Sequence, residues 1–301
     1  MSVINSLKSN KKRLLTGLIV ASVVFFCVVK GGLPLLLLVL AFVYMGSKEY
    51  VEILKNKGFF PFFNVIITIA VVMLIIISLG ANDFIPIILV TGVIISFLAV
   101  LFKGRQPYIA NVATTILGFM FCWLPGYIIL IRQINTSGYN LFDGYLNDGM
   151  NFLILLFFVI LATDTGAYYF GTKYGKHKLA TIISPKKSVE GSIAGAICAL
   201  ITSIAIGSAI NIGVIHSAIL GLLITIFAQL GDLSESLIKR DAGVKDSGNS
   251  LPGHGGFLDR VDSYLFSAPI AYYYLKYFVI TNYSFNDFIT SIKKVLDVIG
   301  F

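Results

Sequence analysis

The chain has 301 residues, of which 57% are hydrophobic and only 13% are charged. A soluble domain carries about 25% charged residues, so this chain has too few charges to cover a water-facing surface. The apolar residues also come in long runs, and a run of about 20 is enough to cross the hydrocarbon core of a bilayer. Composition therefore excludes an ordinary soluble domain and predicts an integral membrane protein.

The net charge of +8 argues for membrane topology rather than for a nucleic-acid partner. The basic residues lie between apolar runs and not along one soluble face, as nucleic-acid binding requires. Lys and Arg collect on cytoplasmic loops of membrane proteins, which accounts for the excess. Cys27, Cys122 and Cys198 each lie inside an apolar run without a Cys-x-x-Cys pair. We expect them to be packing residues and not disulfide partners or metal ligands.

The N-terminus resembles a signal peptide, because Lys8, Lys11, Lys12 and Arg13 precede an apolar run. No small-residue cleavage pattern follows, so we expect a retained first span. The hydropathy pattern predicts an all-α, polytopic protein of about nine transmembrane helices. The second of these spans is short enough to be re-entrant. The predicted spans are 14–29, 33–46, 61–79, 84–102, 110–132, 151–171, 191–211, 214–236 and 261–281.

The spans divide into an N-terminal region, 1–150, with about five helices, and a C-terminal region, 151–301, with about four helices and the polar loops. No internal repeat is apparent, which disfavours a transporter built from two related halves. If the N-terminus is cytoplasmic and nine spans alternate, 18 of the 23 Lys and Arg residues lie on the inner side. That distribution favours a cytoplasmic N-terminus and an outer C-terminus.

Beyond the last span, residues 285–299 have apolar side chains at helical spacing and polar ones opposite. This pattern predicts an amphipathic C-terminal helix lying along the outer membrane surface, or a simple terminal helix. The polar segment 133–150 is punctuated by glycine and is interpreted as an outer loop without a site.

Acidic residues are scarce, and 6 of the 15 crowd into 232–262. A carboxylate inside the membrane costs roughly 3 kcal/mol, so one at the edge of a span is a functional candidate. Asp232, Glu235, Ser236 and Lys239 share one helical face by their spacing. The carboxylate and hydroxyl oxygens suit a hard cation, and Lys239 with Arg240 suits anionic oxygens. The alternative is a last helical turn that carries ordinary solvated charges.

The following segment, 241–256, contains five glycines together with Lys245, Asp246 and His254. Glycine lets backbone N–H groups approach an anion closely, whereas a plain linker would not need this density of titratable groups. Asp259 then begins the last span. It could meet Asp232 across the loop, and two carboxylates plus phosphate oxygens are what Mg²⁺ usually takes.

Arg260 is interpreted as an interfacial anchor or phosphate contact, because guanidinium does not deprotonate. These charges could also do no more than mark the edge of the span.

A second polar region lies upstream, where Asp164 interrupts the sixth apolar run. Lys186, Lys187, Ser188 and Glu190 then lead into the seventh span, with Ser188 as the predicted N-cap. A helix N-terminus flanked by lysines is an anion site. The alternative is that these lysines only obey the positive-inside rule.

Together these residues predict a cytoplasm-facing pocket for a divalent cation and phosphates. A membrane-embedded enzyme acting on phosphates fits this pocket better than an anion transporter, although both remain open at this point.

The 27 residues from Ser236 to Asp262, with Lys-Asp-Ser-Gly at 245–248 and Pro-Gly-His-Gly-Gly-Phe-Leu-Asp-Arg-Val-Asp at 252–262, resemble the phosphatidate cytidylyltransferase (CDP-diacylglycerol synthase) family. The segments 164–168 and 184–191 are also similar to that family. Thr172 and Val189 depart from it, since a basic residue and Trp are common there. The specific resemblance covers about 164–263, and the first 150 residues match only in being serial spans.

The resemblance implies transfer from CTP to phosphatidate, giving CDP-diacylglycerol and pyrophosphate, with Mg²⁺ and often a monovalent cation such as K⁺. It implies that Asp232 and Asp259 bind the metal, and we expect Ser236 or Asp246 nearby. The expected catalytic residues are Asp232, Asp259, Lys239, Arg240, Lys245 and His254. The expected substrate-binding residues are Asp164, Lys186, Lys187, Ser188, Glu190, Asp246 and Arg260.

The resemblance also implies a homodimer, and we expect it in the cell (inner) membrane. The distribution of Lys and Arg favours a site that faces the cytoplasm and argues against a nucleic-acid partner. The rival hypotheses are a lipid or anion transporter, a cytidylyltransferase for another lipid phosphate, and a structural scaffold.

Overall fold

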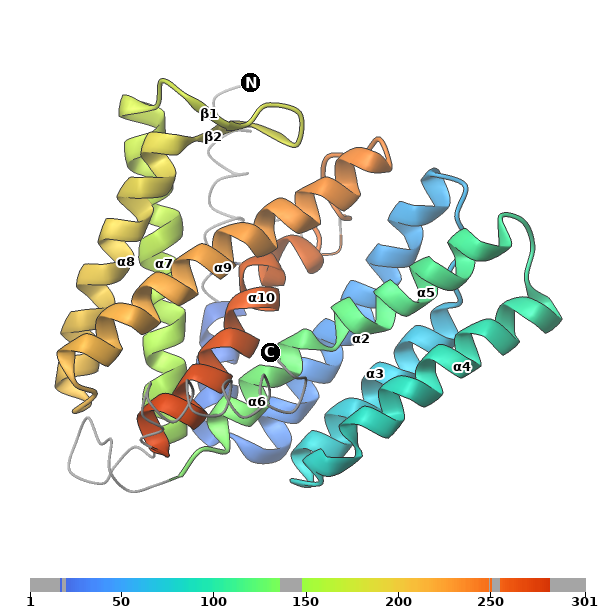
Figure 1. Ribbon diagram of the computed structural model, residues 1–301, viewed down its shortest axis with the longest axis horizontal. Coiled ribbons are helices and arrows are strands. Elements are labelled where there is room, and N and C mark those ends of the chain that lie inside the picture. Colours follow the sequence, from blue (N-terminus) through green and yellow to red (C-terminus); the bar gives the residue numbers. More distant parts are fainter. Residues whose placement is uncertain (1–16, 18–19, 136–147, 249, 251–254, 282–301) are drawn as a thin grey trace, which may run out of the picture.

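The computed structural model describes residues 17, 20–135, 148–248, 250 and 255–281. Long helices run between two ends of the molecule, and a short hairpin lies at one of these ends (Figure 1). The predicted C-terminal helix at 285–299 and most of the predicted outer loop lie outside the described residues. The all-α prediction is confirmed for the body of the described molecule, with two short strands as the exception.

The N-terminal half is a group of antiparallel helices joined by short turns. Gly31 has φ +65 and separates the first helix from α2, a conformation that glycine adopts readily. Arg132 joins the ends of this half by donating to the Val28 carbonyl at 2.9 Å. The elements are a first helix Val20–Lys30, α2 Gly32–Asn56, α3 Phe63–Ser78, η1 Asn82–Phe84, α4 Ile85–Lys103, α5 Tyr108–Cys122, η2 Leu124–Gly126 and α6 Tyr127–Arg132.

The second predicted span was expected to be short, and this expectation is wrong. Helix α2 continues for 25 residues, well past the predicted end at residue 46. The polar residues Ser47 and Glu49 and the aromatic Tyr50 ended the apolar run, but all three are buried against neighbouring elements. Tertiary partners therefore replace water for this polar stretch, so the helix does not have to end there.

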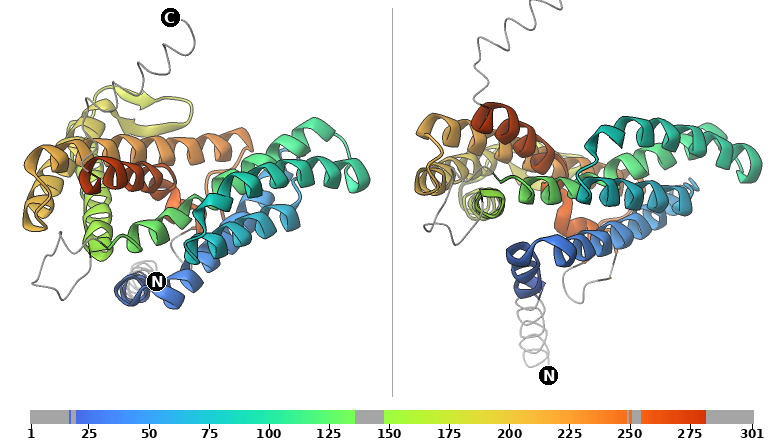
Figure 2. Two further views of the ribbon diagram at one scale, coloured as in Figure 1. Left: turned by 60° about the horizontal axis from the view of Figure 1, so that its bottom comes forward. Right: turned by 90° about the horizontal axis from the view of Figure 1, so that it is seen from below.

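The C-terminal half contains the longest helices and the hairpin. Strands β1 and β2 pair antiparallel, with Lys178 opposite Ser188. Helix α10 lies between the two halves, because it packs on α9 and also contacts α2 and α6 (Figures 1 and 2). The elements are α7 Asp148–Tyr174, β1 Lys178–Ala180, β2 Ser184–Ser188, α8 Val189–Ala209, α9 Val214–Asp241, α10 Leu258–Tyr274 and the π-helix η3 Leu275–Ile280.

Glycines bring the helices of this half into backbone contact. A Cβ at Gly231 of α9 would lie 2.4 Å from the carbonyl oxygen of Asp262, and one at Gly195 of α8 would lie 2.7 Å from that of Thr163. Small residues permit such close packing of membrane helices. The contact at Gly231 places the polar end of α9 directly beside the first turns of α10.

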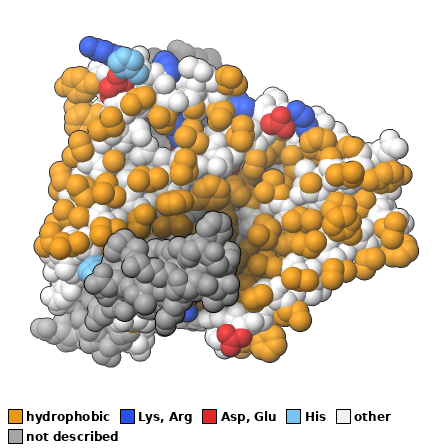
Figure 3. All heavy atoms as spheres, in the orientation of Figure 1, with side chains coloured by type: hydrophobic (Ala, Val, Ile, Leu, Met, Phe, Trp, Pro, Cys, Tyr) orange, Lys and Arg blue, Asp and Glu red, His pale blue; other side chains and the backbone are white. Residues whose placement is uncertain are grey.

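The described surface carries a broad apolar band, with most charges gathered towards one end (Figure 3). Six described helices are long and apolar enough to cross a membrane: α2, η1 with α4, α5 through α6, α7, α8 and α9. Two shorter apolar helices, Val20–Lys30 and α3, match the first and third predicted spans. The chain is therefore a polytopic membrane protein. The count of nine and the division at residue 150 stay predictions.

Candidate active site

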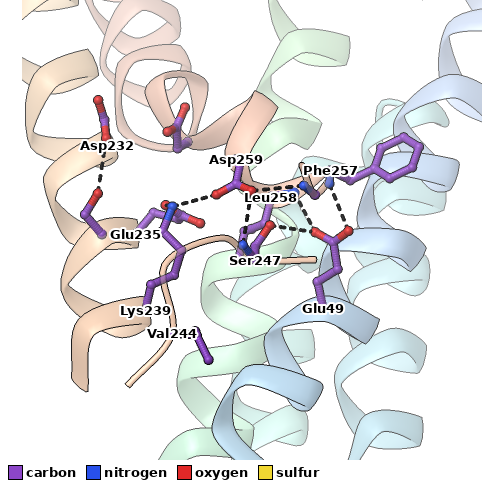
Figure 4. Close-up of polar contacts among 12 residues, drawn as sticks. Glu49, Asp232, Glu235, Lys239, Val244, Ser247, Phe257, Leu258 and Asp259 are labelled. Carbon is purple, nitrogen blue, oxygen red and sulfur yellow. Dashed lines mark hydrogen bonds and ion pairs between the residues drawn. The ribbon is translucent and has the colours of Figure 1, made fainter. Parts of the chain in front are cut away.

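The polar site begins in the C-terminal half of α9, where Asp232 faces strand β2, which directly precedes α8. The Lys187 ammonium group forms an ion pair with Asp232 Oδ2, and both side chains are slightly more than one-quarter exposed. The Ser236 hydroxyl, one turn along α9, donates to Asp232 Oδ1 at 3.4 Å (Figure 4). Asp232, Ser236 and Lys187 were all predicted from the sequence, and the fold brings them together.

Asp259, in the first turn of α10, accepts three hydrogen bonds. Lys239 donates to its Oδ1 at 2.5 Å, and the backbone N–H groups of Ser247 and Gly256 donate to its Oδ2 at 3.1 and 3.0 Å (Figure 4). The side chain is only 10% exposed. Asp259 thus ties the end of α9 and the glycine-rich loop to the start of α10, whereas Asp232 enters a separate ion pair.

Lys239 lies between two carboxylates. Besides Asp259 it forms an ion pair with Glu235, one turn earlier on the same helix, whose side chain is fully buried. Hydrogen-bonded ion pairs of this kind hold buried charges in place. Lys239 was predicted to contact anionic substrate oxygens, but in the structure its described partners are carboxylates. Its position therefore fits a group that orders Asp259.

Glu49 of α2 is a site residue that sequence reasoning missed. The residue is 3% exposed. It accepts hydrogen bonds from the Phe257 N–H at 2.9 Å, the Leu258 N–H at 2.9 Å and the Ser247 hydroxyl at 3.0 Å (Figure 4). Ser247 thus donates its hydroxyl to Glu49 and its N–H to Asp259. The available signal was only a glutamate at the end of an apolar run, three residues before Glu52 and far along the chain from the polar segments.

The loop held between Glu49 and Asp259 depends on glycines that pack against the carboxylate. A Cβ at Gly248 would lie 2.9 Å from Glu49 Oε1, and one at Gly256 would lie 2.5 Å from Glu49 Oε2. These distances are shorter than ordinary van der Waals contact. The glycine density of the loop therefore serves close approach to a carboxylate of the protein, in addition to the anion binding expected from the sequence.

Three carboxylates from three helices form the most acidic part of the site. The charge of Asp164 on α7 interacts with that of Asp232, and Asp262 on α10 interacts with both. The Lys187 charge offsets this repulsion. Like charges held close together favour a bound cation, and an all-oxygen donor set suits Mg²⁺.

In the part of the chain that the structure describes, no three His, Cys, Asp or Glu side chains are already close enough to hold a metal ion. This arrangement still fits Mg²⁺, which takes one or two carboxylates and completes its octahedron with water and substrate phosphate oxygens.

The remaining predicted residues fall into two groups, of which the first makes local contacts. Ser188 is the N-cap of α8, as predicted, and accepts from the Gly191 N–H at 3.2 Å. Glu190 accepts from the Lys176 N–H at 3.0 Å and contacts His177 Nδ1 at 2.5 Å. Arg240 donates to the carbonyl oxygens of Ile183 and Val244 at 3.1 and 3.2 Å. These contacts fix the hairpin and the loop around the site.

The second group is exposed and free to meet a substrate. Lys186, Lys245, Asp246 and Arg260 are exposed side chains on the hairpin, the loop and α10. His254 lies outside the described residues. Exposed cations that surround buried carboxylates can attract a polyanion and hold it near a metal.

These features define a class of protein: a polytopic membrane protein whose polar site of carboxylates and lysines lies where several helices meet. The sequence model described as "Cytidylyltransferase family" matches residues 11–278, which is most of the chain. The chain belongs to the cytidylyltransferase family.

Two curated relatives are similar to most of the chain, and a third to less than half of it. The phosphatidate cytidylyltransferase of Synechocystis sp. is 34% identical over 295 residues, covering 88% of this chain and 96% of the relative. The phosphatidate cytidylyltransferase of Staphylococcus aureus (strain COL) is 36% identical over 275 residues, covering 86% and 96%. That of Staphylococcus haemolyticus is 47% identical over 135 residues, covering 44% and 52%.

Proposed function

We propose that this protein is a phosphatidate cytidylyltransferase, which converts CTP and phosphatidate to CDP-diacylglycerol and pyrophosphate in phospholipid biosynthesis. The observation that carries the proposal is the match to relatives of that name over 86–88% of this chain and 96% of their length. A site of carboxylates and lysines inside a membrane protein supports it, because both substrates are polyanions and one is a lipid.

In the proposed reaction a phosphate oxygen of phosphatidate attacks the α-phosphorus of CTP, and the bond from that phosphorus to the β-phosphate bridging oxygen breaks. The nucleophile is already an anion, so the reaction needs no general base. The difficulty is bringing two polyanions together in line, and phosphoryl transfer depends on positioning and charge neutralisation. Lys187, Lys186, Lys245 and Arg260 are the cations that we assign to substrate phosphates.

Mg²⁺ is the proposed cofactor, and Asp232 and Asp259 are the proposed ligands, with Ser236 beside the first. When bound, the ion would neutralise phosphate charge and orient the reacting oxygens. Asp262 and Asp164 would add negative charge on the same side of the site. We also propose K⁺ as a second ion and a homodimer as the working state, in line with the resemblance to the family.

We propose that the site faces the cytoplasm, where CTP is made. The described segments richest in Lys and Arg, including 173–187 and 239–248, lie towards the same end of the helices as the loop 103–108. Lys and Arg are retained on the cytoplasmic side of membranes. The lipid would enter sideways from the inner leaflet while its tails stay in the bilayer.

The direct test is pyrophosphate release by the purified protein in detergent. We expect release that requires CTP, phosphatidate and Mg²⁺ together, that stops with EDTA and that returns when Mg²⁺ is added back. Release with a different lipid phosphate in place of phosphatidate would point to a cytidylyltransferase of other specificity. Movement of phosphatidate across the membrane of proteoliposomes, without any pyrophosphate release, would show that the protein is a transporter and not an enzyme.

Glu49→Gln is expected to lower kcat/KM by about tenfold to a hundredfold, because misplacing groups by a fraction of an ångström has effects of this size. Glutamine keeps the volume but turns one acceptor oxygen into a donor that faces the Phe257 N–H or the Ser247 hydroxyl. Limited proteolysis should become faster in the loop 247–257 of the folded variant.

Glu52→Gln is the matched control, since Glu52 lies one turn further along α2 and is exposed. It should leave the activity and the proteolysis unchanged. Equal behaviour of the two variants would remove Glu49 from the set of positioning residues.

A further inference from the structure

A large apolar cavity lies beside the polar site and has no role in the proposal so far. Its volume is about 480 Å³, and the first helix, α2, α6, α7 and α10 contribute to its wall. Most of the lining is aliphatic or aromatic, including Val24, Leu38, Phe42 and Ile154. Among the described lining residues, Arg260 is the only charged one. A cavity of this composition suits a hydrocarbon ligand with one anionic end.

Helix α10 connects the cavity to the carboxylates. Arg260 and Tyr264, four residues apart on one face of α10, both line the cavity. The Tyr264 ring packs edge-on against Phe157, another lining residue, with centroids 5.4 Å apart. The Tyr264 hydroxyl also interacts electrostatically with Asp164 and Asp262. The polar end of the cavity is therefore next to the acidic part of the site.

The cavity reaches the lipid-facing surface of the described molecule. Phe25 of the first helix and Phe158 of α7 line it, and they are 63% and 51% exposed. A lipid in the bilayer could therefore place a chain there without crossing polar protein surface. Arg260 would meet the lipid phosphate, because guanidinium pairs with phosphate through two parallel hydrogen bonds.

The cavity is large enough for a whole fatty acyl chain. A water molecule occupies about 30 Å³ in the liquid, and a methylene group is of similar size, so a volume of about 480 Å³ has room for at least roughly 16 such groups.

We propose that this cavity binds one acyl chain of the lipid substrate and that Arg260 holds the phosphate of the same molecule. The proposal rests on the proposed function, since it names phosphatidate as the occupant. If an acyl chain fills this cavity, the lining residues of α2 and α7 determine which acyl-chain lengths the protein prefers.

A photo-crosslinking experiment tests the occupant without any turnover. Phosphatidate with a diazirine in one acyl chain is added to the purified protein in lipid nanodiscs without CTP, irradiated and mapped by mass spectrometry. We expect labels on Val24, Leu38 or Ile154, reduced by excess unlabelled phosphatidate but not by phosphatidylcholine. Labels confined to outward-facing residues such as Ile94, with no competition, would overturn the proposal.

A second experiment fills part of the cavity with a larger side chain. Ile154→Trp should raise the KM for dioleoyl phosphatidate by at least about tenfold, because part of the chain loses its apolar site. The KM for dihexanoyl phosphatidate and for CTP should change less than about twofold. Ile94→Trp, the same change on the exposed face of α4, is the control and should change neither.

Equal increases for both lipids would contradict a chain site. The crosslinking arm still decides the question if Ile154→Trp does not fold. If the wild-type protein releases no pyrophosphate, specific labels in the cavity would show that lipid binding survives the failure of the proposed reaction.

Discussion

Asp259→Asn is expected to lower kcat/KM for transfer from CTP to phosphatidate by about 10³-fold. Loss of a ligand of the proposed Mg²⁺ would remove several kcal/mol of charge stabilisation from the transition state, and 4 kcal/mol corresponds to about 10³ in rate. The asparagine amide would place a donor against Lys239 or against the N–H groups of Ser247 and Gly256, which all donate to Asp259. The proposed metal ligand would be lost in the same step.

Asp241→Asn is the matched control for this change. Asp241 also pairs with a lysine, Lys57, at 2.8 Å, but its side chain is 56% exposed. Exposed pairs contribute about 0–1 kcal/mol, so we expect nearly wild-type activity. Pyrophosphate release by both variants should be compared at matched size-exclusion profiles and melting temperatures. Folded Asp259→Asn that keeps more than about a third of the activity would remove Asp259 from the proposed mechanism.

Asp232→Asn should have an effect of similar size, about 10³-fold, but with a different signature. Asp232 lies near Asp164 and Asp262, and its described ion pair with Lys187 is partly exposed. If Asp232 binds Mg²⁺, its loss removes several kcal/mol of charge stabilisation. The Mg²⁺ concentration that gives half-maximal activity should therefore rise at least about tenfold. The same titration on Asp241→Asn should match the wild-type protein.

A change of metal preference separates ligation from simple positioning. Asp232→Cys should be nearly inactive with Mg²⁺ and recover part of the activity with Mn²⁺ or Cd²⁺, because thiolate prefers softer ions. The activity of the wild-type protein should not increase when Mn²⁺ or Cd²⁺ replaces Mg²⁺. An unchanged Mg²⁺ titration in Asp232→Asn, together with no recovery of Asp232→Cys, would assign Asp232 to holding Lys187 rather than the metal.

The two predicted metal ligands show where local sequence reasoning ends. Asp232 and Asp259 were expected to meet across the glycine-rich loop. The fold brings both to one polar region but gives them different lysines, Lys187 and Lys239. The loop folds back on Asp259 through two backbone N–H groups. Side-chain spacing along one helix could not predict this, because the partners come from the loop itself.

Glu49 shows the same limit from the other direction. In the sequence, Glu49 is one of several charges at the end of a predicted span, with Lys48, Glu52 and Lys55, so nothing distinguishes it as functional. Its importance arises from contacts with residues about 200 positions away, Ser247, Phe257 and Leu258. The short second span was predicted wrongly for the same reason, since the polar residues that ended the apolar run are buried by tertiary contacts.

The sequence by itself determined the membrane class, most of the helices, the Ser188 cap and the two polar segments. Apolar run length, capping chemistry and the scarcity of carboxylates are local properties of the chain. Only the tertiary structure decided which lysine pairs with which carboxylate, that Glu49 orders the loop, and that an apolar cavity adjoins Arg260. These features depend on how α2, α7, α9 and α10 pack, and packing brings together residues whose separation along the chain carries no periodic signal.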